Sequence, residues 1–320
     1  MEAALNPYRQ HIRPIRSRKD ILAVADLIEI CFADHMDVDG HEYVHHLRRF
    51  AVPEEGLAGK LLEPFQLPVR GLVWEEDGRI VGNLSLINLN RHGKRYNLIA
   101  NVATHPDYRR RGIARHLTET ALQQIREAGE KEAWLHVRED NPVAYHLYLS
   151  LGFREENRRT NWLWEPQHGF FQKVKNESIH ITPRHAADWQ FQSQWLDEIY
   201  PPSVAWNLPL DKNRLKPNFW KDLWLWLNGS PLMHLSARKK DQLVGVVSWQ
   251  PTGAYADMLW VTARKEWEEE GIAVLLSEMR RRLHLNRPLT VNYPANRAVE
   301  GFRQAGFHPH VTLIWMRIQF

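Results

Sequence analysis

The stretch Val102-Ala-Thr-His-Pro-Asp-Tyr-Arg-Arg-Arg-Gly-Ile-Ala-Arg115 joins an apolar run, residues 98–102, to a segment whose apolar residues recur with helical spacing. We therefore expect a strand, a short polar loop and the start of a helix. The first turn of a helix has unpaired N–H groups and a partial positive charge, which together favour an anion. Gly112 lets the backbone approach a ligand closely, and three consecutive arginines add formal charge. The sequence therefore predicts a phosphate-bearing ligand at this loop.

Two common phosphate-binding motifs are absent from the sequence. No Gly-x-x-x-x-Gly-Lys-Ser/Thr string occurs, and the loop does not read Gly-x-Gly-x-x-Gly. The pattern from Arg109 to Ala114 is Arg-x-x-Gly-x-Ala. It resembles the pyrophosphate-binding loop, Gln/Arg-x-x-Gly-x-Gly/Ala, of the GNAT superfamily of acyl-CoA-dependent N-acetyltransferases.

A second block of the sequence carries the same resemblance. Residues 141–153 read Asn-Pro-Val-Ala-Tyr-His-Leu-Tyr-Leu-Ser-Leu-Gly-Phe and follow an expected strand at 132–137. They match the family's Asn-x-x-Ala-x-x-Leu-Tyr-x-x-x-Gly-Phe at every fixed position, and Gly152 suits the left-handed residue that ends a helix. About residues 11–165 are therefore identified as a member of the superfamily.

The resemblance implies which groups hold acetyl-CoA. Backbone groups of Val102, Ala103 and Thr104 would contact the pantetheine arm and the thioester, and one of their N–H groups would be the oxyanion donor. Asn141 matches the family's pantetheine-contacting asparagine. The pyrophosphate would be surrounded by the loop and first helical turn, comprising Arg109, Arg110, Arg111, Gly112, Ile113, Ala114 and Arg115.

Tyr148 matches the family's tyrosine and is our expected general acid. A phenol with a pKa of about 10 can protonate the departing thiolate if it lies within hydrogen-bond reach. The alternative role is that of a packed tyrosine whose hydroxyl is hydrogen-bonded. The implied reaction is direct transfer of the acetyl group to a primary amine in a ternary complex.

The general base stays open, because the expected cofactor strand has no Glu or Asp before the loop. The carboxylates Asp34, Asp37 and Asp39 favour a cationic acceptor. The alternative is that these are solvated loop and turn residues. The candidates for the base are Asp34, His35, Asp37 and His41, near the region where this family usually builds its acceptor site, and also Glu75 and Glu76. All of them could equally be solvated loop or turn residues.

A competing motif, His41-Glu-Tyr-Val-His45, fits the His-Glu-x-x-His pattern of zinc peptidases. No third ligand follows at the usual spacing, and the motif falls on an expected helix of a fold that other residues already explain. We therefore expect a surface or acceptor-site helix and no metal.

The chain repeats itself beyond an expected linker near residues 165–177. Residues 260–273 match residues 101–114 with Gly-Ile-Ala in register, and residues 298–307 resemble residues 144–153. The sequence therefore predicts an α/β (α+β) protein of two tandem GNAT-like domains, each with a central, mostly antiparallel mixed sheet flanked by helices. We expect these domains at residues 1–170 and 171–320.

The second copy departs from the family where the chemistry lies. The three arginines of the loop become Glu268, Glu269 and Glu270, and the position of Tyr148 holds Phe302. At an effective dielectric constant of about 20, each like-charge pair at ~6 Å costs a few kcal/mol. We therefore expect a degenerate copy that binds no acyl-CoA and completes the acceptor site or the domain interface. A helical stripe in it, Trp220, Trp224 and Leu227, is expected in a core or an interface.

Composition limits the remaining possibilities. The 320 residues suffice for two domains, and the net charge of +4 is too small to indicate nucleic-acid binding. The single Cys31 excludes an internal disulfide framework and predicts a reducing compartment, the cytoplasm. No apolar run could span a bilayer, so no membrane partner is expected.

Two other functions remain as alternatives. The chain could be a non-catalytic acyl-CoA-binding regulatory or interaction protein, or it could bind nucleic acid through its basic loop. The acceptor and the oligomeric state are not predicted.

Overall fold

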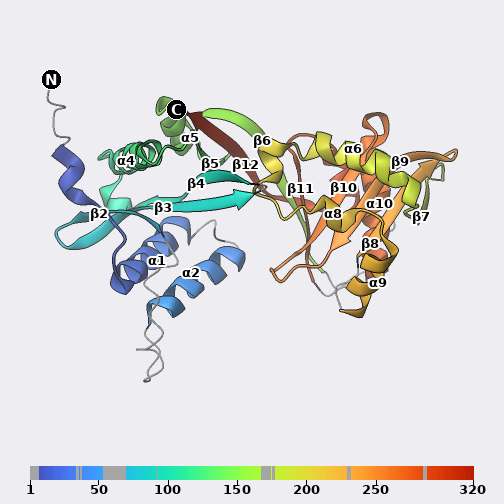
Figure 1. Ribbon diagram of the computed structural model, residues 1–320, viewed down its shortest axis with the longest axis horizontal. Coiled ribbons are helices and arrows are strands. Elements are labelled where there is room, and N and C mark those ends of the chain that lie inside the picture. The colour runs from blue at the N-terminus through green and yellow to red at the C-terminus, as the bar shows by residue number, and fades with distance from the viewer. Residues whose placement is uncertain are drawn as a thin grey trace. The chain divides into compact units, whose positions relative to one another are not determined.

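The computed structural model describes residues 7–33, 36, 38–52, 70–91, 93–166, 174, 177–228, 232–283 and 287–320 (Figure 1). The chain divides into two compact units, and neither is one continuous segment. The first comprises Met1–Val137, Asn141–Glu155 and Trp315–Phe320, and the second comprises Arg138–Asp140 and Glu156–Ile314. The predicted domains, 1–170 and 171–320, meet instead at a single boundary, and those ranges stay a prediction.

The first unit has a sheet in the order β1-β2-β3-β4-β5, in which only β4 and β5 pair in parallel. In Figure 1, α4 lies on one side of this sheet and α1 and α2 lie on the other. The elements are η1 (Pro7–His11), β1 (Ile12–Pro14), α1 (Arg18–Phe32), α2 (Val38–Ala51), β2 (Arg70–Glu76), β3 (Arg79–Arg91), β4 (Lys94–Thr104), η3 (Pro106–Tyr108), α4 (Ile113–Glu127), β5 (Glu132–Arg138) and α5 (Pro142–Ser150).

Local sequence signals explain how these elements begin and end. The Asp77-Gly78 pair forms the turn between β2 and β3, with φ values of +50° and +73° that suit a tight hairpin. Helix α1 begins at a capping box: the Ser17 hydroxyl accepts the Asp20 N–H, and the Asp20 carboxylate accepts the Ser17 N–H.

The second unit repeats the pattern of one parallel strand pair in an antiparallel sheet. Its strands run in the order β6-β11-β10-β9-β8-β7, and β10 and β11 are parallel. The remaining elements are β6 (Arg154–Trp164), β7 (His180–Pro183), η4 (Ala186–Asp188), α6 (Trp189–Ile199), α7 (Pro202–Ala205), α8 (Lys212–Leu215), α9 (Phe219–Leu227), β8 (Met233–Lys239), β9 (Gln242–Gln250), β10 (Asp257–Ala263), η5 (Lys265–Trp267), α10 (Glu268–Leu283), β11 (Leu289–Pro294), α11 (Val299–Gln304) and β12 (His308–Gln319).

Helix α9 carries the stripe that the sequence assigns to a core or an interface. The side chains of Trp220, Trp224 and Leu227 are all more than half exposed, so this stripe is not part of the second unit's core. The helical spacing of these apolar residues predicts an apolar face on α9, but it does not say whether another surface covers that face. Within the described residues, no helix is both long and apolar enough to cross a membrane.

Candidate cofactor site

The two parallel strands of the first unit separate after a short contact. Their register covers Leu98 with Trp134 and Ile99 with Leu135. Beyond it, β4 continues to Thr104 paired with β3 on its other side. Backbone groups on the β5 side of residues 102–104 are therefore outside the parallel ladder. The groups that the sequence assigns to the pantetheine arm and the thioester lie on this segment.

The loop after β4 has an unusual backbone. Arg110 and Gly112 both adopt left-handed conformations, with φ of +63° and +80°, on either side of Arg111. Gly112 is the N-cap of α4 and makes no side-chain cap, and the helix's first backbone bond runs from the His116 N–H to the Gly112 carbonyl at 3.0 Å. The N–H groups of residues 113–115 precede that bond. As the first-turn donors of a helix, they suit an anion.

The arginines of the loop also bind the protein around it. The Arg109 Nε donates to the Thr104 carbonyl at 3.4 Å, and Arg111 contacts the Glu76 carboxylate at 3.3 Å. Arg115 donates to the Ser150 hydroxyl at 2.7 Å, which links the first turn of α4 to the end of α5. The guanidinium groups are thereby held near the start of α4. Glu76, a candidate base, lies at this loop.

Helix α5 positions the two predicted residues of the second block. The Asn141 side chain caps the helix by accepting the Ala144 N–H at 3.1 Å. Tyr148 is 6% exposed, and its ring lies edge-on to Phe153 at 5.9 Å. Burial raises the pKa of the Tyr148 phenol above its ordinary value, so the phenol is held in the protonated form that an acid requires.

The remaining candidates for the base are only partly described. Glu75 forms an ion pair with Arg13 at 2.5 Å. Arg13 also binds Asp20 in the first turn of α1, so Glu75 helps to stabilise the start of this helix. His41 is exposed on α2. The candidates Asp34, His35 and Asp37 lie outside the described residues, as does the side chain of Asp39.

The zinc-peptidase motif lies on the surface of α2. Its members His41, Glu42 and His45 are all exposed. Within the part of the chain that the structure describes, no three His, Cys, Asp or Glu side chains gather closely enough to hold a metal ion.

The sequence did not single out a polar cluster beside β4. Asn101 has a positive φ of +50°, and its side chain contacts the hydroxyls of Tyr43 and Ser85. Asn83, fully buried, donates to the Asn101 carbonyl at 2.9 Å. The available signal was polar residues interrupting apolar strands, at positions 83, 85 and 101.

In the second unit, the corresponding helix start is filled by the chain itself. The Glu268 carboxylate accepts the Tyr293 hydroxyl at 2.7 Å and pairs with Arg297. The Glu269 carboxylate accepts the Gly301 N–H at 2.5 Å, so α11 packs directly onto the start of α10. In the sequence these glutamates align with the arginines of the first unit's loop, but they lie in the first turn of α10, whereas the arginines precede α4.

Gly301 permits this contact, and its replacement supplies a test. A Cβ atom there would overlap the Glu269 carbonyl oxygen, which is backbone and cannot rotate away. We expect Gly301→Ala to lower the free energy of unfolding by about 1–3 kcal/mol, although alanine is the better helix former. Chemical denaturation measures this. Gly253→Ala, where a Cβ meets nothing within 4 Å, is the matched control, and equal effects of both variants would contradict the packing.

Large side chains fill the region around β10 and β11. Trp260 and Tyr293 are fully buried, Tyr200 lies edge-on to Trp260 at 5.2 Å, and Phe302 stacks on Trp162 at 4.7 Å. The buried Arg159 donates to the Ile199 carbonyl at 2.8 Å, and burial lowers its pKa to about 10. This region of the second unit is a packed core.

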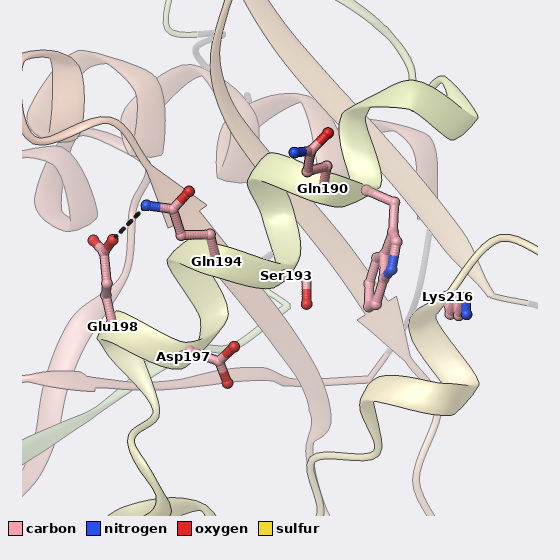
Figure 2. A pocket seen from close by; sticks show the side chains of 7 residues that line it. Gln190, Ser193, Gln194, Asp197, Glu198 and Lys216 are labelled. Carbon is pink, nitrogen blue, oxygen red and sulfur yellow. Dashed lines mark hydrogen bonds between the residues drawn. The ribbon is translucent and has the colours of Figure 1, made fainter.

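A surface depression of about 700 Å³ follows α6 in the second unit (Figure 2). Lys212 contacts both Asp197 carboxylate oxygens at 2.8 Å, and the Gln194 amide donates to Glu198 at 3.3 Å. Because these carboxylates already have partners and the depression is widely open, we assign it no role. Its lining comprises Trp189, Gln190, Ser193, Gln194, Asp197, Glu198 and Lys216.

Comparison with known proteins gives a family for the first part of the chain. The family model of the acetyltransferase (GNAT) family matches residues 35–153. A [Ribosomal protein bS18]-alanine N-acetyltransferase of Escherichia coli (strain K12) is 42% identical over 62 residues, which are 19% of this chain and 42% of that protein. A mycothiol acetyltransferase of Thermomonospora curvata is 31% identical over 117 residues, 36% of this chain and 38% of that protein. The chain thus spans less than half the length of these relatives.

A solved structure extends the likeness in fold along nearly the whole chain. The GCN5-related N-acetyltransferase from Sphaerobacter thermophilus superposes with a TM-score of 0.58 at 18% identity, covering 97% of this chain and 96% of that one. At this identity the likeness concerns the fold alone.

Proposed function

Residues 35–153 belong to the acetyltransferase (GNAT) family, and on that premise we propose that the chain transfers the acetyl group of acetyl-CoA directly to a primary amine in a ternary complex. One observation carries the proposal. Arg110 and Gly112 adopt left-handed conformations before α4, and the first-turn N–H groups and three arginines lie on this one short loop, a combination suited to an anion. The loop directly follows the separated end of β4, from which a thioester could be held.

In this proposal the loop takes the pyrophosphate. The donors are the backbone N–H groups of residues 110–114, with the guanidinium groups supplying charge. Backbone groups of Val102, Ala103 and Thr104 hold the pantetheine arm and the thioester, and Asn141 contacts the pantetheine. One N–H of the strand stabilises the oxyanion that develops on the carbonyl.

Tyr148 acts as the general acid. When the neutral amine attacks the thioester carbon, an N–C bond forms, the C–S bond breaks and the thiolate takes the phenolic proton. The attacking nitrogen loses one proton to water or to the unassigned base, and Tyr148 takes up a proton from water before the next turnover. The hydroxyl is buried on α5, and burial raises its pKa, so it carries that proton at neutral pH.

We propose that the second unit binds no acetyl-CoA. Its Glu268 and Glu269 carboxylates occupy the helix start, and aromatic side chains pack the region between its strands. An anion there would meet carboxylates in place of arginines. Its role would be to complete the acceptor site or the domain interface.

The acceptor is the least constrained part of the proposal. One relative is named for N-acetylation of an alanine of a ribosomal protein, so a peptide with an N-terminal alanine is the first acceptor to test. We place the reaction in the cytoplasm, since the chain has the single cysteine Cys31 and no disulfide framework.

Release of free CoA tests the function. Acetyl-CoA is incubated with the protein and a panel of primary amines that includes the N-terminal alanine peptide, a polyamine and an aminoglycoside. We expect amine-dependent CoA release with at least one of them. Saturable binding of acetyl-CoA without CoA release from any amine would instead favour a non-catalytic acyl-CoA-binding protein.

A further inference from the structure

Strand β4 contains a bulge just before its proposed thioester-binding end. Against β3, Ala100 pairs with Ser85 and Ala103 pairs with Asn83, so Asn101 and Val102 both oppose Leu84. Asn101 adopts φ of +50°, a left-handed conformation that residues other than glycine adopt uncommonly. Bulges re-aim the strand that carries them and are frequent beside active sites.

Four residues, which we name the bulge clamp, hold this conformation. They are Tyr43 of α2, Asn83 and Ser85 of β3, and Asn101 itself. The Asn83 amide donates to the Asn101 carbonyl at 2.9 Å, and the Asn101 amide donates to the Tyr43 hydroxyl at 3.2 Å and to Ser85 at 3.5 Å. Backbone and side chain of the bulged residue are both held.

The bulge clamp is maintained at a cost to stability. Asn83 is fully buried, and its Oδ1 atom has no hydrogen-bond partner among the described residues. An unsatisfied buried acceptor and a strained residue in adjacent strands both oppose folding. Local conflicts of this kind concentrate at functional sites.

We propose that the bulge clamp is a positioning device for acetyl transfer, and that Tyr43 and Asn101 are its key residues. It fixes the peptide groups that follow Asn101, so that a backbone N–H of residues 102–104 meets the thioester carbonyl of acetyl-CoA. The proposal rests on the function proposed above. An oxyanion donor is effective only when it is held in place before the reaction, so a released bulge would weaken it.

The position of Tyr43 gives the clamp a second consequence. Tyr43 belongs to α2, and burial raises the pKa of its phenol, so the hydroxyl stays neutral and serves as a hydrogen-bonding group. Strand β4 is therefore bonded to α2, which lies on the opposite side of the sheet from α4 (Figure 1). The pyrophosphate loop and the clamp hold β4 from different elements.

The test uses [1-13C]acetyl-CoA, whose carbonyl resonance reports hydrogen bonding to the thioester. We expect the resonance to move downfield when the wild-type protein binds it. In Tyr43→Phe and Asn101→Gly, acetyl-CoA should bind with a Kd within about threefold of wild type but lose about half or more of that shift. Glycine accepts a positive φ, so Asn101→Gly removes the side-chain bonds to Tyr43 and Ser85 without adding strain, while the bond from Asn83 to the backbone carbonyl of residue 101 can remain. The same variants should lower kcat about tenfold at unchanged KM for acetyl-CoA.

Tyr255→Phe is the matched control, because it removes a tyrosine hydroxyl that bonds Glu165 at 2.8 Å in the second unit. It should keep the full shift. A full shift in both clamp variants, or no shift in the wild-type complex, would overturn the proposal. A wild-type protein that binds no acetyl-CoA would overturn the proposed function, and the clamp's role with it. Should Tyr43→Phe fail to fold, Asn101→Gly gives the same decision.

Discussion

Gly112→Asp is expected to weaken acetyl-CoA binding at least about 100-fold, which corresponds to ~2.7 kcal/mol. Two effects contribute. Gly112 has φ of +80°, so any side chain there is strained, and a new Cβ would press on the His116 ring at 3.3 Å. The added carboxylate would also stand beside the pyrophosphate, where like charges repel. Calorimetric titration of acetyl-CoA into the purified variant measures the loss.

Gly93→Asp is the matched control for that substitution. Gly93 lies between β3 and β4, has φ of +75°, and a Cβ there would meet nothing within 4 Å. It therefore carries the same backbone strain and the same added charge away from the loop. Acetyl-CoA binding should be unchanged in Gly93→Asp. If Gly112→Asp also binds within about threefold of wild type, the loop does not hold the pyrophosphate.

Tyr148→Phe is expected to lower kcat about 100-fold and to leave KM for acetyl-CoA nearly unchanged, because a general acid acts in the transition state. The ring would keep its contact with Phe153, so little stability should be lost. Steady-state kinetics with the best acceptor measure both constants. Tyr145→Phe, on the same helix with its hydroxyl 3.3 Å from Glu155, is the control and should retain wild-type kcat.

The pH dependence supplies an independent check on Tyr148. Burial raises the pKa of this phenol above its ordinary value of about 10, so its proton is present at and below that pH. The wild-type kcat should therefore show no loss of an acid between about pH 7 and pH 10. A wild-type kcat that falls through loss of an acid within this range, or an unchanged kcat in Tyr148→Phe, would remove the assignment.

Features encoded by neighbouring residues could be predicted from the sequence. The glycine at the start of α4 and the left-handed Gly152 just after α5 each depend on a few adjacent positions, and the structure confirms both. The turn at Asp77-Gly78 is encoded just as locally. The capping box of α1 is a signal of the same local kind, with Ser17 as the N-cap and Asp20 three positions after it. Such signals are local, so they need no knowledge of the tertiary fold.

The bulge clamp could not be predicted in that way. Its existence depends on the register between β3 and β4 and on a tyrosine from α2, and register is a property of strand pairing. The second unit shows the same limit. The three glutamates predict a site unsuited to an anion. They do not predict that the Glu269 carboxylate accepts the N–H of Gly301, because these residues are 32 positions apart. Their pairing follows only from how α10 and α11 pack.

The most direct test is calorimetric titration of acetyl-CoA into the whole protein, beside Gly112→Asp. Our account predicts one site per chain in the wild-type protein and no measurable site in the variant. Two sites would show that the second unit, with its glutamates at the helix start, also binds the cofactor. One site that survives Gly112→Asp would place the cofactor elsewhere, and either result would contradict the account.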